Sequence, residues 1–141
     1  MPTVRFRVDF NARCSVGVGK IQLLEAIATA GSLSQAARML KMSYRRAWLL
    51  LEDMNCSFDE PVACTSVGGR GGGGVALSAF GRRLIDDYRS VDRAIQALAA
   101  AQLRHVVSHA DAGTELHRIR VGSIRRKSAV RARRTDPRRS G

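Results

Sequence analysis

The chain has 141 residues, enough for one small domain with an appendage and too few for two cores of ordinary size. Hydrophobic residues make up 45% of it, which excludes wholesale disorder, and no apolar run approaches the roughly 20 residues of a membrane-spanning helix. The formal net charge of +12 favours an anionic partner, of which nucleic acid is the usual one. Eleven basic and three acidic residues lie in 104–141, so most of the excess charge belongs to that segment.

The N-terminal residues lack the apolar segment of a secretory signal, and three cysteines cannot all pair within one chain. Both features favour a cytoplasmic protein with reduced thiols and no membrane association. We interpret Cys14, Cys56 and Cys64 as buried small hydrophobic residues. A thiol redox sensor is the alternative, with Cys64 as its best candidate.

The first predicted element is a strand. Hydrophobic and charged residues alternate from Val4 to Phe10, a period of two that predicts a half-buried strand, and a turn follows over 11–15. From Lys20 the period becomes helical. The predicted helix ends at Gly31, and its buried stripe comprises Ile21, Leu24, Ile27 and Ala28.

Two short capped helices follow. Ser32 and Gln35 have the spacing of a capping box, and the buried face of the helix that they start comprises Leu33, Ala36, Ala37 and Leu40. Ser43 caps the next helix, whose core face on a helical wheel comprises Ala47, Leu50, Leu51 and Met54. Two helices joined by a turn of three or four residues predict a helix-turn-helix.

A hairpin is predicted after these helices, with strands at 62–67 and 75–77 flanking the glycine-rich segment 68–74. A hairpin in this position is the wing of a winged helix. Gly69, Gly71 and Gly74 match the spacing of a dinucleotide-binding fingerprint, but a strand rather than a helix follows them, so we assign no such site.

Ser78 caps a long helix whose apolar residues are spaced four and three apart, the spacing of a coiled-coil seam. Because a helix with one narrow apolar stripe needs a partner in water, we expect a homodimer. The predicted dimerisation residues are Leu84, Tyr88, Val91, Ile95 and Leu98. Residues 104–141 show no sustained period and are expected to form an Arg-rich, disordered tail to a domain of residues 1–103.

The first turn of the second helix in a helix-turn-helix enters the DNA major groove. Arginine suits this position because its planar fork can donate twice to guanine or clamp a phosphate. The residues predicted to contact DNA are Lys41, Ser43, Tyr44, Arg45, Arg46, Trp48, Leu49 and, on the wing, Arg70. A solvated helix face is the alternative for the two adjacent arginines. For Trp48 we favour packing at the edge of the core, with a phosphate contact as the alternative.

Four runs of the chain resemble the N-terminal domain of ModE, a family of molybdate-responsive bacterial regulators: Gly19–Ile27, Gly31–Ala37, Met42–Trp48 and Gly68–Gly74. The resemblance covers about residues 3–100. It implies an α+β fold, a winged helix-turn-helix of LysR type, that binds palindromic DNA as a homodimer through its long last helix. Nothing after Arg104 resembles the β-barrel domains that bind molybdate in that family, so molybdate sensing is not carried over.

We therefore predict a homodimeric, sequence-specific DNA-binding regulator of transcription whose partner is double-stranded DNA. A protein-interaction module and a thiol- or metal-responsive sensor with the same fold are the alternatives. No nucleophile with a base is visible, and the adjacent carboxylates at 52–53, 59–60 and 86–87 are interpreted as surface charges rather than an acid/base couple, so neither enzymatic activity nor a cofactor is expected. His105 and His109 have the i, i+4 spacing of a metal pair, but without a third ligand nearby we assign no metal site. The residues identify no small-molecule effector.

Overall fold

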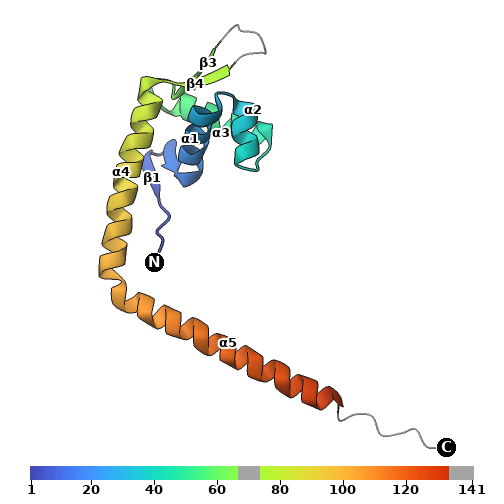
Figure 1. Cartoon of the computed structure of the whole chain (residues 1–141). Coiled ribbons are helices and arrows are strands. Elements are labelled where there is room, and N and C mark those ends of the chain that lie inside the picture. Colours follow the sequence, from blue (N-terminus) through green and yellow to red (C-terminus); the bar gives the residue numbers. More distant parts are fainter. Residues whose placement is uncertain (67–73, 134–141) are drawn as a thin grey trace, which may run out of the picture. The chain divides into compact units, whose positions relative to one another are not determined.

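The computed structural model describes the backbone of residues 1–66 and 74–133 (Figure 1). Its elements in chain order are β1 (Arg7–Asn11), β2 (Cys14–Gly17), α1 (Val18–Ala30), α2 (Leu33–Met39), α3 (Tyr44–Ser57), β3 (Ala63–Ser66), β4 (Gly74–Leu77), α4 (Ala79–Gln102) and α5 (Arg104–Arg133). Residues 3–97 form one compact unit, and α5 lies in a second. Within the described residues, no helix is both long enough and apolar enough to cross a membrane.

The N-terminal strand is part of a hairpin. Strands β1 and β2 pair antiparallel, with Val8 opposite Val16. The half-buried positions Val4, Phe6 and Val8 alternate with exposed ones as predicted, but the strand begins only at Arg7 and Phe10 is 54% exposed. Strand β2 was not predicted, because two of its four residues, Cys14 and Ser15, fall where the sequence indicated a turn. A strand of four residues is too short to establish a period of two by itself.

The predicted ends of the three helices around the turn are confirmed. Helix α1 stops at Gly31, whose φ of 71° lies in the left-handed region that glycine tolerates. Ser32 Oγ accepts the Gln35 N–H at 3.2 Å, and Ser43 Oγ accepts the Arg46 N–H at 3.1 Å. Each serine thus satisfies a backbone donor that has no partner within its helix.

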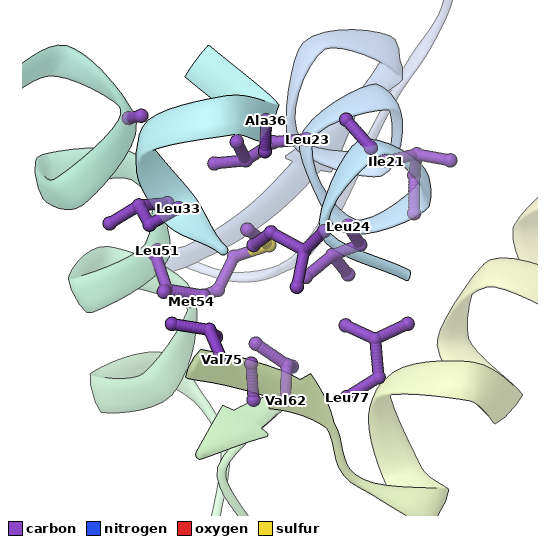
Figure 2. Packing of buried hydrophobic residues seen from close by; sticks show 14 of the residues in the cluster. Ile21, Leu23, Leu24, Leu33, Ala36, Leu51, Met54, Val62, Val75 and Leu77 are labelled. Carbon is purple, nitrogen blue, oxygen red and sulfur yellow. The ribbon is translucent and has the colours of Figure 1, made fainter. Parts of the chain in front are cut away.

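A single hydrophobic cluster joins the helices α1, α2, α3 and α4 and the strands β2, β3 and β4 (Figure 2). Its fully buried large side chains are Ile21, Leu23, Leu24, Ile27, Met54, Val16 and Val62. One residue of the predicted α1 stripe, Ala28, is exposed, whereas Leu23 and Ala26 are buried. The single-stripe prediction fell short because α1 is packed against β2, α2, α3 and β4, which together cover more than one narrow face.

The amide side chain of Asn55 ties α3 to the base of the hairpin. Its Oδ1 accepts the N–H groups of Val62 at 2.8 Å and Ala63 at 3.4 Å, and its Nδ2 donates to the Ala63 carbonyl at 3.2 Å. One side chain therefore fixes how the chain leaves α3 and enters β3.

The start of α4 is held against the same segment. Ser78 Oγ accepts the Gly81 N–H at 2.9 Å and donates to the Pro61 carbonyl at 2.6 Å. Gly81 lies so close to the Val62 backbone that a Cβ atom on it would come within 2.0 Å of the Val62 oxygen. Helix α4 therefore begins in direct contact with the end of the loop that precedes β3.

Strands β3 and β4 pair antiparallel after α3, with Cys64 opposite Ala76. The Val75 N–H donates to the Gly31 carbonyl at 3.0 Å, which attaches the hairpin to the end of α1. A helix-turn-helix followed by such a hairpin is a winged helix, so the predicted α+β fold class is confirmed. The residues between the strands, Arg70 among them, lie outside the described part of the chain.

Helix α4 also holds the N-terminal segment. The rings of Phe6 and Tyr88 stack at 4.6 Å between centroids, and Gln96 exchanges two hydrogen bonds with the Val4 backbone at 2.9 and 2.7 Å. Arg89 donates to both carboxylate oxygens of Glu25, at 2.6 and 3.1 Å, which links α4 to α1.

Residues 104–133 differ from the expected disordered tail, because the structure forms helix α5 over Arg104–Arg133. The physical reason is local. This segment has no proline and only two glycines, Gly113 and Gly122, and it is rich in arginine and alanine, which favour helices. The prediction of disorder rested on the few large apolar residues of this segment, and these do not decide whether an arginine-rich segment forms a helix. Residues 134–141 of the expected tail lie outside the described part of the chain.

Candidate nucleic-acid interface

The first turn of α3 presents three large polar side chains to solvent. Tyr44, Arg45 and Arg46 are all exposed, with 57% of Tyr44 accessible. Ser43, which caps the helix, is exposed in front of them. The structure thus places these four predicted residues together on one accessible surface.

Burial of the opposite side of α3 sets this orientation. Ala47 and Met54 have no accessible surface, and Leu51 is 7% exposed. Because these three residues are locked in the core, α3 cannot rotate about its axis without exposing them to water. The outward direction of Arg45 is therefore fixed by packing.

The turn between α2 and α3 is held by a compact set of backbone bonds. The Met42 N–H donates to the Ala37 carbonyl at 3.0 Å, and the Lys41 N–H donates to the Arg38 carbonyl at 3.1 Å. Lys41 has a φ of 55°, a left-handed conformation usually taken by glycine at the end of a helix. This conformation places the predicted Lys41 at the tight turn itself, exposed beside the start of α3.

The cations of this surface make no ion pair, as is also the case for Arg5, Arg13 and Arg82 elsewhere in the described residues. Arg7, Arg83 and Arg89 each contact a carboxylate. Within the described residues, the arginines and the lysine of the helix-turn-helix make no such ion pair; these are Arg38, Lys41, Arg45 and Arg46. Unpaired cations attract an anion without first breaking an existing contact.

Arg38 is the residue of this surface that sequence reasoning missed. It is exposed in the last turn of α2, next to the turn that carries Lys41. The sequence signal that could have identified it is its position on α2 opposite the buried Ala36 and Ala37, because this position predicts an exposed side chain.

Two further residues of the predicted set lie beyond the first turn of α3. Leu49 is 50% exposed, as its position opposite the core face indicated. Trp48 is 46% exposed and is not part of the buried cluster. The favoured interpretation of Trp48 as a packing residue is therefore wrong, because the core is closed by smaller residues of α3 without it.

The predicted dimerisation residues differ in burial, so they do not form one accessible surface. Leu84 and Tyr88 are 9% and 6% exposed because they pack in the core of their own chain. Val91 and Leu98 are 46% and 61% exposed, and Ile95 is half-buried. The regular spacing thus combines intramolecular core positions with accessible ones, which periodicity alone does not separate.

Beside Val91 lies an apolar groove of about 380 Å³, lined mainly by hydrophobic side chains of β1, α4 and the loop after α3. Three aromatic rings line the groove. The ring centroids of Phe10 and Phe58 are 5.8 Å apart, those of Phe58 and Phe80 are 5.1 Å apart, and both pairs are edge to face. Phe10 is 54% exposed, so the groove presents apolar surface to solvent.

The shifted pKa values belong to α4 and not to the helix-turn-helix. The hydrogen bond to the Glu25 carboxylate raises the pKa of Arg89, and the hydrogen bond from Gln96 is the largest cause of a lowered pKa at Asp92. Burial raises the pKa of Tyr88 above its usual 10.0. These groups hold α4 against the N-terminal segment and α1, so their perturbation reflects structure and not chemistry on a substrate.

The cysteine interpretation holds for one residue of three. Cys14 is 2% exposed, whereas Cys56 and Cys64 are exposed and all three are free thiols. Cys64 lies in β3 at a position that faces solvent, since Ala63 and Val75 cover the core side of the hairpin. No group of three or more metal-ligating side chains occurs among the residues described.

Comparison with known proteins finds several relatives named ModE. The chain is 36% identical over 88 residues to the molybdenum transport protein ModE of Azotobacter vinelandii, covering 62% of this chain and 33% of that protein. It is 42% identical over 69 residues to the transcriptional regulator ModE of Yersinia pestis, covering 49% and 26%. The chain therefore spans about a third or less of the length of these curated relatives. No family model matches it.

Among solved structures, the DNA-binding domain of CbnR in a DNA complex is similar, with a TM-score of 0.47 and 18% sequence identity. That similarity covers 63% of this chain and 95% of the other. The sequence resemblance noted above is confirmed by the curated relatives: over its N-terminal half, this chain is homologous to the ModE transcriptional regulators.

Proposed function

We propose that this protein is a DNA-binding regulator of transcription that acts in the cytoplasm as a homodimer. The observation that carries the proposal is the exposed first turn of α3, where two arginines without carboxylate partners stand on a helix whose opposite face is locked in the core. The homologous ModE proteins are described as transcriptional regulators, which supports the same role here.

In the proposed complex, α3 enters the major groove of double-stranded DNA. Arg45 and Arg46 reach base edges or phosphates, and Tyr44 contacts phosphate or a thymine methyl group. Lys41 and Ser43 lie at the N-terminus of the helix, where backbone N–H groups favour a phosphate. Arg70, which lies between β3 and β4 in the sequence, is proposed to contact the DNA backbone or the minor groove, and the exposed Trp48 is proposed to contact a phosphate.

The basic segment 104–141 adds attraction that does not depend on DNA sequence. In α5, Arg104 and Arg120 are exposed, and Arg118 has only a long contact of 4.0 Å with Glu115. Charge of this kind supplies non-specific affinity that weakens steeply as salt rises. Residues 104–141 are thus proposed as an electrostatic appendage to a DNA-binding domain of residues 1–103.

The test begins by selecting bound sequences from random duplex DNA with the full chain, and continues by fluorescence anisotropy on the selected site. Arg45→Ala should cost about 1 to 3 kcal/mol, which is roughly a five- to 150-fold loss of affinity, and should relax the preference at one base pair. Arg7→Ala is the matched control, since Arg7 is an exposed arginine on β1 paired with Asp9. Equal affinities of the two variants would contradict the assigned surface.

The homodimer is proposed to form over the apolar groove and the exposed part of α4. Val91 lies at the rim of the groove and the three aromatic rings line it, so a second copy would remove considerable apolar surface from water. Val91→Asp should shift the mass measured by light scattering from two chains to one, whereas the exposed Ser90→Asp should leave it unchanged. A selected DNA site without two-fold symmetry would contradict the dimer.

A further inference from the structure

Two of the three histidines of this chain lie together on the first turns of α5, far in sequence from the proposed DNA-binding surface. His105 and His109 are both exposed, and their Nε2 atoms are 3.3 Å apart. Their rings lie edge to face with centroids 4.7 Å apart. The third histidine, His117, is exposed two turns further along the helix.

The separation of the two Nε2 atoms fits a shared metal ion. Imidazole nitrogens lie 2.0 to 2.1 Å from Zn²⁺, and two such ligands at a tetrahedral angle are about 3.3 to 3.4 Å apart. The 3.3 Å in this structure therefore matches two neighbouring corners of a zinc tetrahedron. We propose that His105 and His109 together bind a divalent transition-metal ion such as Zn²⁺.

Binding requires one rearrangement of protons. In the present arrangement one Nε2 carries a hydrogen and donates it to the lone pair of the other, so neither Nε2 has a lone pair free for an ion. For both nitrogens to bind the ion, that imidazole carries its proton on Nδ1 instead. Both rings face solvent, so water can carry the proton between the two nitrogens of that ring, and the hydrogen bond between the two Nε2 atoms is replaced by their bonds to the ion.

Two imidazoles fill half of a tetrahedral site, and no group of three ligands occurs in the part of the chain that the structure describes. We infer that a second copy supplies the other two imidazoles, a step that rests on the proposed homodimer. The continuation of α5 supports a second copy as the partner. The residues that follow the pair in steps of three and four are Ala112, Leu116 and Ile119, of which Leu116 is 56% and Ile119 61% exposed. In a parallel pair of α5 helices this stripe meets its twin, and so does each histidine pair.

The experiment is a calorimetric titration of the full chain with ZnCl₂, with Cys56→Ser and Cys64→Ser in every sample so that the exposed thiols do not compete. The expected result is one ion per two chains. His109→Ala should weaken binding at least tenfold, and His117→Ala, the matched control, should leave it unchanged. Equal binding by these two variants, or no binding by the parent protein, would overturn the site. One ion per chain would overturn its sharing between two copies.

The outcome is separable from that of the proposed function. Light scattering and DNA binding are measured in parallel with EDTA present, where the histidine pair holds no metal. A dimer that binds DNA in EDTA but takes up no Zn²⁺ refutes the metal site and leaves the proposed function standing. Zn²⁺ uptake without any DNA affinity supports the metal site and refutes the proposed function.

Discussion

Replacing Gly81 by alanine tests how closely α4 is packed against the base of the wing. A Cβ atom at this position would lie 2.0 Å from the Val62 carbonyl oxygen and 2.9 Å from its carbon. The first distance is about 1.5 Å shorter than the roughly 3.5 Å at which non-bonded atoms attract each other. Because the obstructing atoms are backbone, a change of side-chain rotamer cannot relieve the overlap.

The expected loss of stability follows from three contributions. Overpacking of this kind costs about 1 to 3 kcal/mol, and the upper part of that range applies because backbone must move. Displacing Val62 also weakens the hydrogen bond from the Ser78 N–H to its carbonyl, 3.0 Å long, at a cost of about 1 kcal/mol. Alanine regains about 1 kcal/mol through its better helix propensity. The net effect is a loss of about 2 to 3 kcal/mol.

Urea unfolding followed by circular dichroism measures this difference. With a slope of about 1.5 kcal/mol per molar urea, the midpoint of Gly81→Ala should fall by about 1 to 2 M. Gly19→Ala is the control, since Gly19 is an exposed glycine of α1 with no atom within 4 Å of the added Cβ. Its midpoint should stay the same or rise slightly. A Gly81→Ala midpoint equal to that of the parent protein would refute the argument from close approach.

Three further predictions concern α4. Ser78→Ala removes the cap of the Gly81 N–H and should lower the free energy of unfolding by about 1 kcal/mol in urea; an unchanged midpoint would count against capping. The Gln96 hydrogen bond lowers the pKa of Asp92, so the ionised Asp92 carboxylate stabilises the fold above about pH 4. This contribution disappears as the pH falls through the lowered pKa. The free energy of unfolding of Asp92→Asn should therefore decline less steeply in acid than that of the parent protein. An unaltered pH dependence would show that the Asp92 carboxylate does not contribute. Burial raises the pKa of Tyr88, so its neutral form stabilises the fold below pH 10 and this contribution is lost as the pH rises through the raised pKa. In Tyr44→Phe, where Tyr88 is the remaining tyrosine, phenolate absorbance should appear at a higher pH in folded than in urea-unfolded protein; coincident titrations would refute the shift.

The helix-turn-helix was predictable because its information is local. Ser32 and Ser43 cap their helices through side chains that contact backbone three residues away, and Gly31 ends α1 through its own conformation. The core face of α3 follows from a period that any buried helix shows. These features place Tyr44 and Arg45 on the outside without knowledge of the remaining fold.

The unpredicted features depend on contacts between distant residues. Tyr88 matches a coiled-coil seam by spacing, but its ring stacks on Phe6 and its hydroxyl donates to the Phe6 carbonyl at 3.0 Å, 82 residues away. Trp48 was expected to pack at the edge of the core because of its residue type, and only the closed packing of α3 leaves it exposed. Helix α5 was missed for another reason: its helical preference comes from its composition, and its large apolar residues, Leu116 and Ile119 among them, are too few to establish a helical period by themselves.

The three hydrogen bonds of Asn55 have a mechanical consequence. They join the C-terminal part of α3 to the residues that enter β3, so a displacement of the helix is transmitted to the hairpin without slack. Tilting α3 relative to the hairpin requires breaking these contacts of a single amide, whereas moving the two together leaves them intact.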